Sequence, residues 1–173
     1  MKKLTLTTLK KSLGSKTNLE LINEIADLYK KFPVVKDYFQ AKEGNPEEIL
    51  KKYKKIIKKE FTIHARGIPK VRLSIAKKAV QYFKKISINP ENTVDIMLTF
   101  VEEVSNFNNE FGLDGRSNYT SSENMFIDAL ILAEENDLLA DFKTRVDLII
   151  KNATEVSGHL DTLSDHYGHF YEW

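Results

Sequence analysis

Histidine and carboxylate side chains gather near the C-terminal end of the chain, at a spacing that could bind a metal ion. His166, His169 and Glu172 follow one another every three residues, so a helix would carry them on one face. Neutral imidazole and carboxylate are ligands for zinc and other transition metals, which makes these residues candidates for a metal-dependent activity. Aromatic residues interleave with them, and an aromatic tail that docks on the helices is the alternative. That alternative needs no ion, so we assign no metal or cofactor to the chain.

A second group of candidate residues consists of lysines on two expected helices. Residues 47–85 carry 13 Lys/Arg and 3 Asp/Glu, and lysine ammonium groups can replace the counterions of nucleic-acid phosphates. The candidate polyanion-binding residues are Lys51, Lys54, Lys55, Lys58, Lys77, Lys78, Lys84 and Lys85. In the alternative, these lysines form a solvated outer face and their stems cover the apolar stripe beneath. Arginine, the better phosphate ligand, is scarce here, which favours the solvated face over nucleic-acid binding.

No catalytic pattern is apparent in the chain. It contains no phosphate-binding loop, no dinucleotide-binding glycine motif, no His-Glu-x-x-His and no Gly-x-Ser-x-Gly. Cysteine is absent, which excludes disulfides, thiolate metal ligands and cysteine nucleophiles. We therefore lean towards a protein that binds rather than catalyses.

The two halves of the chain carry opposite charge. Residues 1–87 have 22 Lys/Arg and 8 Asp/Glu, whereas residues 88–173 have 4 Lys/Arg and 17 Asp/Glu. Such asymmetry indicates how a protein meets its partners. Halves that lie side by side would help to set which helices pair, and halves at opposite ends would let two copies meet. The sequence therefore predicts a protein-interaction module with a charge-segregated surface, whose partner is another protein or a second copy. Nucleic acid is the less favoured partner.

Helical periodicity positions these residues along nearly the whole chain. Thr17 and Glu20 have capping-box spacing, and Asn45 and Asn89 each precede Pro-Glu, a helix-start signal. Thr120 and Glu123 repeat the capping-box spacing. Apolar residues at three- and four-residue spacing predict helices over about 17–32, 33–39, 46–61, 70–86, 90–111, 120–133 and 138–156. The polar, glycine-containing segment 112–118 is expected to be the clearest loop.

We therefore predict an all-α fold of about seven antiparallel helices in a single domain over residues 1–173, with a tail at 158–173 of uncertain order. An irregular helical bundle and a short solenoid-like stack of helix pairs are both compatible with this pattern. No stretch is apolar and long enough to cross a membrane, and the first residues lack the core of a signal peptide. We expect a cytoplasmic protein without a membrane partner.

Several short segments occur here in a recognisable combination. They are FPVVKDYF at 32–39, YKKIIKKEF at 53–61, AKKA at 76–79, FKK at 83–85, Phe107 with NEFG at 109–112, and the Tyr-Gly of the tail. Together they resemble a family of small bacterial proteins known only as a domain of unknown function. The resemblance extends over nearly the whole chain, which implies one domain. Since the family has no assigned activity, the resemblance adds no catalytic residue.

Overall fold

The structure, a computed structural model, describes residues 3–62, 71–111 and 116–171. The described residues form α1 (Leu6–Gly14), α2 (Asn18–Lys31), α3 (Pro33–Glu43), α4 (Pro46–Phe61), α5 (Leu73–Ile86), α6 (Pro90–Phe111), α7 (Arg116–Glu134), α8 (Leu139–Lys151), a 3-10 turn η1 (Val156–Gly158) and α9 (His159–Tyr171). No strand occurs in these ranges. The predicted all-α class is confirmed, with nine α-helices described where about seven were expected.

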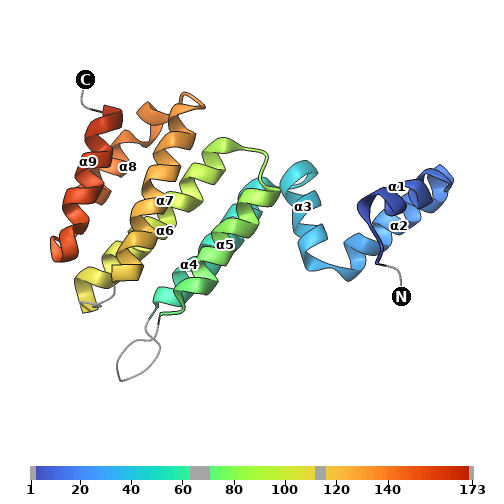
Figure 1. The fold of residues 1–173 in the computed structure, drawn as a ribbon, viewed down its shortest axis with the longest axis horizontal. Coiled ribbons are helices and arrows are strands. Elements are labelled where there is room, and N and C mark those ends of the chain that lie inside the picture. The colour runs from blue at the N-terminus through green and yellow to red at the C-terminus, as the bar shows by residue number, and fades with distance from the viewer. Residues whose placement is uncertain (1–2, 63–70, 112–115, 172–173) are drawn as a thin grey trace.

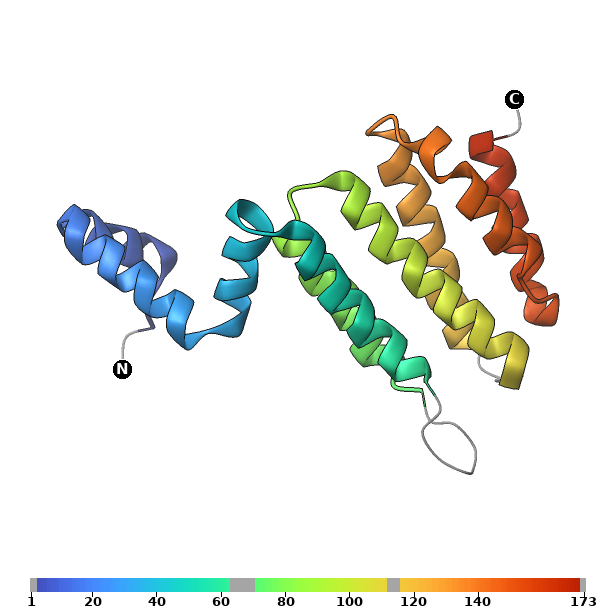
Figure 2. The same ribbon diagram turned by 180° about the vertical axis from the view of Figure 1, so that it is seen from behind.

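Six of these helices form three antiparallel pairs that stack side by side. Figures 1 and 2 show α4 with α5, α6 with α7, and α8 with α9 in this order along the molecule. Contacts join each pair to the next, mainly through α4 with α6 and through α7 with α9. Of the two predicted architectures, this arrangement corresponds to the short stack of helix pairs.

One continuous apolar core runs through the stack. Its fully enclosed side chains include Ile57 of α4, Phe83 of α5, Phe100 of α6 and Phe126 of α7. The core begins at Ala41 near the end of α3 and extends to Phe170 of α9. α1 and α2 contribute no buried residue. The apolar stripes predicted for the helices from α4 onwards are therefore buried, and the stripe of α2 is not.

Local signals explain where several helices begin. The side-chain oxygen of Asn45 accepts a hydrogen bond from the Glu48 amide at 3.1 Å, and Pro46 occupies the first helical position, where no donor is needed. Asn89 accepts from the Glu91 amide at 2.8 Å in the same way. Thr17 and Glu20 form the predicted reciprocal capping box at the start of α2. These helix starts are confirmed.

Three other expectations need correction. The chain is helical from Leu6, where no helix was predicted, and α7 begins at Arg116, so Thr120 lies inside a helix rather than at its cap. The helix predicted over 138–156 ends at Lys151, and a separate helix, α9, follows. The break contains Ser157 and Gly158, both with a left-handed backbone (φ 59° and 71°) that cannot continue a right-handed helix.

The tail docks on the preceding helices, as the aromatic alternative predicted. Leu163 and Phe170 are buried, and the Tyr171 hydroxyl donates a hydrogen bond to the carbonyl of Leu139 at 3.0 Å. The segment of uncertain order is therefore a packed helix as far as Tyr171.

The N-terminal end has the opposite character. We define the arm as residues 4–32, which contain α1 and α2. In both views the arm lies beyond α3, away from the stacked pairs (Figures 1 and 2).

Candidate interaction surfaces

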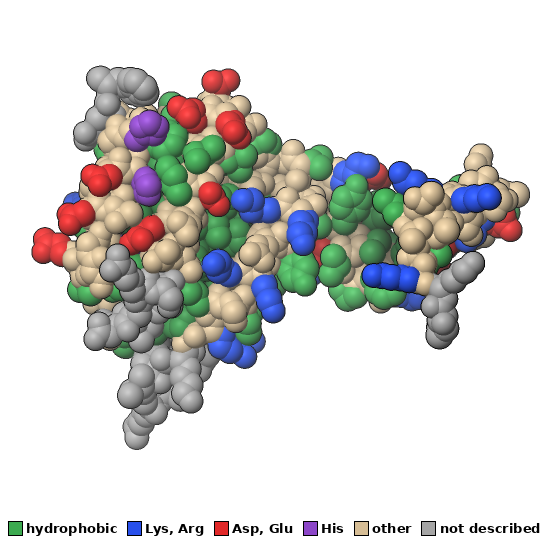
Figure 3. All heavy atoms as spheres, in the orientation of Figure 1, with side chains coloured by type: hydrophobic (Ala, Val, Ile, Leu, Met, Phe, Trp, Pro, Cys, Tyr) green, Lys and Arg blue, Asp and Glu red, His purple; other side chains and the backbone are tan. Residues whose placement is uncertain are grey.

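Charge is sorted along the length of the folded molecule. On the face in Figure 3, acidic side chains gather over the end formed by α7 to α9. Lysine and arginine side chains gather over α5 and the arm. The separation along the sequence thus becomes a separation in space.

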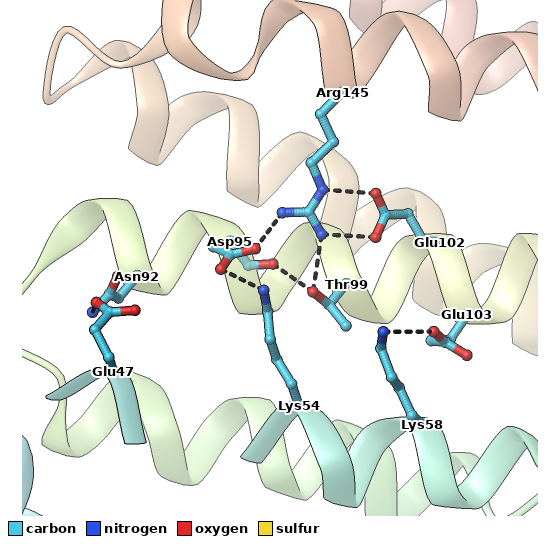
Figure 4. A network of polar contacts seen from close by, with 9 residues as sticks. All are labelled: Glu47, Lys54, Lys58, Asn92, Asp95, Thr99, Glu102, Glu103 and Arg145. Carbon is cyan, nitrogen blue, oxygen red and sulfur yellow. Dashed lines mark hydrogen bonds and ion pairs between the residues drawn. The ribbon is translucent and has the colours of Figure 1, made fainter. Parts of the chain in front are cut away.

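Where the two halves meet, opposite charges join helices of neighbouring pairs (Figure 4). Arg145 of α8 donates to both oxygens of Glu102 at 2.6 and 2.7 Å and to Thr99 at 2.9 Å. It also pairs with Asp95, which accepts from Lys54 of α4 at 2.5 Å. This Arg145 network links α4, α6 and α8. Arg145 and its partners on α6 all belong to the acidic half of the chain, and the Lys54–Asp95 pair joins that half to the basic half.

A second ion pair also joins α4 to α6. Lys58 of α4 lies 3.9 Å from the carboxylate of Glu103 on α6. Burial raises the pKa of Glu103, and the nearby Lys58 charge opposes that effect. Lys54 and Lys58 are thus directed at acidic partners of this chain.

The other candidate lysines differ in their exposure and in whether they contact another side chain. Lys77 is half-buried and donates to Ser121 at 3.4 Å. Five are exposed and form no ion pair with any described residue: Lys51, Lys55, Lys78, Lys84 and Lys85. Lys51 and Lys55 line a shallow groove along α4 together with Glu48, Lys52, Ile56 and Lys59. The free basic surface is therefore smaller than the sequence suggested.

The predicted metal ligands are not brought together as a group. His166 and His169 lie on α9; His166 is half-buried, and the exposed His169 ring packs edge-on against Phe170 at 5.0 Å. Glu172 lies outside the described residues. Within the described ranges, no three His, Cys, Asp or Glu residues are arranged to hold a metal ion.

Another histidine near the C-terminal end is buried and contacts a carboxylate. His159, at the start of α9, is completely buried, and its Nδ1 lies 2.9 Å from a carboxylate oxygen of Glu123 on α7. The Tyr119 ring packs beside it at 5.0 Å. A carboxylate at Nδ1 orients the imidazole, but the Nε2 atom is enclosed and, in the described structure, accepts or donates no hydrogen bond. The contact therefore joins α9 to α7 and offers no group to a substrate.

At the other end of the stack, a polar contact fixes α3 against α4. Asp37 is buried, and its carboxylate accepts from Lys52 at 2.6 and 2.7 Å and from the Tyr53 hydroxyl at 3.0 Å. Burial raises the pKa of Tyr53, and the neighbouring Asp37 adds to the effect. Because α2 follows directly into α3, this contact sets where the arm leaves the stack.

The arm itself presents apolar side chains to solvent. Of fifteen large hydrophobic residues exposed in the described structure, eight lie on the arm and two more on α3. The apolar face of the arm consists of Leu4, Leu6, Leu9, Leu19, Ile22, Ile25, Leu28 and Phe32, which are between 37% and 69% exposed. Exposed hydrophobic residues concentrated on one segment in this way often mark an interaction site.

A groove continues this face onto α3. It has a volume of about 520 Å³ and lies between Ile22, Ile25 and Tyr29 of α2 and Phe39 and Gln40 of α3. Tyr29 packs edge-on against Phe39 at 6.1 Å and accepts a hydrogen bond from Gln40 at 3.1 Å. The groove is therefore preformed by contacts between the two helices. The apolar spacing in the sequence predicts the stripe on α2, but no sequence pattern indicates that this stripe stays uncovered.

Comparison with known proteins agrees with the resemblance noted above. The chain matches no curated protein and no solved structure. No helix in the described ranges combines the length and apolar character needed to cross a membrane. A family model described as a family of unknown function, DUF6155, matches residues 4–161, which includes the arm and most of the stacked helices. The chain therefore belongs to this family of unknown function.

Proposed function

We propose that the chain is a protein-interaction module whose docking element is the arm. The observation that carries the proposal is the apolar face, since α1 and α2 are capped, amphipathic helices that bury no residue within their own chain. α1 has nine residues, and isolated helices shorter than about 12 residues are marginal in water. A partner that covers the face would therefore stabilise the arm as well as bind it.

The free energy gained by burying the apolar face is large enough for specific binding. Burying a large apolar side chain completely contributes about 1.5–3 kcal/mol, so eight half-exposed ones contribute on the order of 10 kcal/mol. The cost of association is of similar size, about 4–15 kcal/mol. We expect affinity to depend on the few best-packed residues of the face, with the separated charges of the molecule orienting the encounter.

Site-specific photo-crosslinking in cells tests this proposal. A benzophenone amino acid is placed at Ile22 in the arm or, as the matched control, at Leu148, which is similarly exposed on α8 (61% and 52%). We expect covalent adducts from position 22 and few from position 148. Equal labelling of the two positions, or no adduct from position 22, would refute a docking role of the arm.

Nucleic-acid binding is a second candidate, supported by the lysines along α4. Lys51, Lys55 and Lys59 are exposed and have no ion pair within the described part of the chain. Binding through them would weaken as salt rises, with a logarithmic slope of about −0.7 to −0.9 per phosphate contacted. Anisotropy titrations with short single-stranded and duplex oligonucleotides test this. Lys51→Glu should weaken binding and Lys151→Glu, on α8, should not; no binding at low salt excludes the candidate.

A further inference from the structure

We infer that the occupant of the apolar face is the arm of a second copy of this chain, so that two arms pack into a four-helix bundle. This inference rests on the proposed function and adds the identity of the partner. Three observations support it: the size of the arm, the shape of its apolar face and the distribution of its charges.

The size of the arm suits a dimer interface. Stable interfaces bury about 800 Å² per partner, contributed by about 20–30 residues. The arm, residues 4–32, is of that length, and its eight exposed hydrophobic residues supply the apolar centre that such an interface needs. Its position beyond α3 leaves it accessible to a second molecule (Figure 1).

The shape of the apolar face makes it complementary to itself. Leu21, Ile22, Ile25, Leu28 and Tyr29 recur at three- and four-residue spacing, which places them on one apolar stripe along α2. Two helices with such stripes pack side by side, and two pairs of helices joined by short connections form a bundle. Only residues 15–17 separate α1 from α2. A twofold axis would bring equivalent surfaces together.

The remainder of the described surface offers no comparable counterpart. The exposed large hydrophobic residues beyond α3 are isolated on different elements: Tyr82, Ile88, Ile131, Leu148 and Val156. The acidic end of a second copy could attract the arm by charge, but these single residues could not cover its stripe. An arm-to-arm contact therefore buries apolar area that a head-to-tail contact leaves exposed.

The charges of the arm permit this contact and predict its response to salt. The arm, residues 4–32, contains five lysines and three acidic residues. Two of the acidic residues already pair within the arm, Glu24 with Lys16 and Asp27 with Lys31. Two arms therefore repel weakly, and salt screens that repulsion. Sodium chloride should strengthen an arm-to-arm dimer, whereas it should weaken a head-to-tail contact between basic and acidic ends.

Sedimentation equilibrium of the full chain tests the inference over a micromolar concentration series at low and high sodium chloride. We expect the mass to rise towards twice the 20.0 kDa of one chain and the dimer to be retained or tightened at high salt. Ile22→Asp should return the mass to that of one chain. Ile25→Asp, at a second exposed position of the stripe, should do the same, and Leu148→Asp should remain dimeric. Circular dichroism checks that each variant keeps its helical content.

Three results would overturn the inference. They are a single-chain mass throughout the series, a dimer that salt dissociates, and a dimer that Leu148→Asp disrupts as strongly as Ile22→Asp. The crosslinking experiment separates this failure from failure of the proposed function. If the purified chain is monomeric while position 22 captures a different protein in cells, the arm still docks a partner, but that partner is not a second copy.

Discussion

Replacing Arg145 with alanine should destabilise the fold, because this side chain joins α8 to α6 through several charge-assisted hydrogen bonds. Its guanidinium reaches Glu102 through two bonds of 2.6 and 2.7 Å and Thr99 through one of 2.9 Å, and it also pairs with Asp95. Alanine would leave Glu102 without its cation in a site where the Glu102 side chain is 32% exposed. Asp95 would keep Lys54 as a partner.

The size of the effect follows from the partial burial of these groups. Removing one member of a fully buried ion pair costs about 3–5 kcal/mol, and an exposed pair contributes about 0–1 kcal/mol. The Arg145 side chain is 24% exposed, so we expect a loss between these limits, about 2–3 kcal/mol. With a urea m-value of about 2 kcal/mol per molar, the unfolding midpoint should fall by about 1–1.5 M.

Urea unfolding followed by circular dichroism measures this shift. Lys151→Ala is the control, because Lys151 is exposed on the same helix and pairs with no described residue; it should change stability by less than about 0.5 kcal/mol. A double-mutant cycle of Arg145→Ala with Glu102→Ala should give a coupling energy of about 1–3 kcal/mol. If Arg145→Ala is no worse than Lys151→Ala, the Arg145 network does not stabilise the stack.

Three further predictions concern individual side chains. His159→Ala removes a buried ring and leaves Glu123 without a partner, so it should lower the free energy of unfolding by about 2–4 kcal/mol in urea. Asn45→Ala removes the cap of α4 and should cost about 1 kcal/mol, measured by thermal unfolding. Glu103→Gln should raise the melting temperature at neutral pH, because burial raises the pKa of Glu103 and its ionisation disfavours the folded state.

Each of these predictions has its own control. His169→Ala, on the exposed side of α9, should leave stability within about 0.5 kcal/mol of the wild type. Asn45→Asp retains a capping oxygen and should recover most of the loss. Glu103 favours the folded state at low pH, where its carboxyl is protonated in both the folded and the unfolded protein. This contribution to the free energy of unfolding is lost as pH rises from the ordinary pKa of 4.5 through the raised pKa. The gain from Glu103→Gln should therefore vanish below pH 4.5, and a gain that persists there would contradict this explanation.

The sequence predicted helices where the deciding interactions are local. Asn45 and Asn89 cap the residues that directly follow them, so a short segment contains the whole signal. Thr120 and Glu123 show how the same pattern misleads. Glu123 has capping-box spacing, but its carboxylate contacts His159, 36 residues further along the chain.

Long-range partners also explain what could not be predicted at the candidate surfaces. Periodicity placed Lys54 and Lys55 on a polar side of α4, but only the packing of α6 shows that Lys54 meets Asp95 and Lys55 meets solvent. The regular spacing of His166 and His169 predicted a shared helix face. His159, the buried one, lacked such a pattern. Likewise, the stripe of α2 indicated that this face requires burial without indicating which molecule covers it.

The stacking of helix pairs in sequence order also determines which helices unfold first. The middle pair is shielded on both sides, and α6 alone buries thirteen residues, against three each on α8 and α9. In a linear array, each helix pair is stabilised mainly by contacts with its immediate neighbours. The terminal pairs therefore unfold locally at a lower free energy than the middle pair. Backbone amides should accordingly exchange with solvent deuterium fastest at the two ends and slowest along α6, and a protease should trim the molecule inwards from its ends.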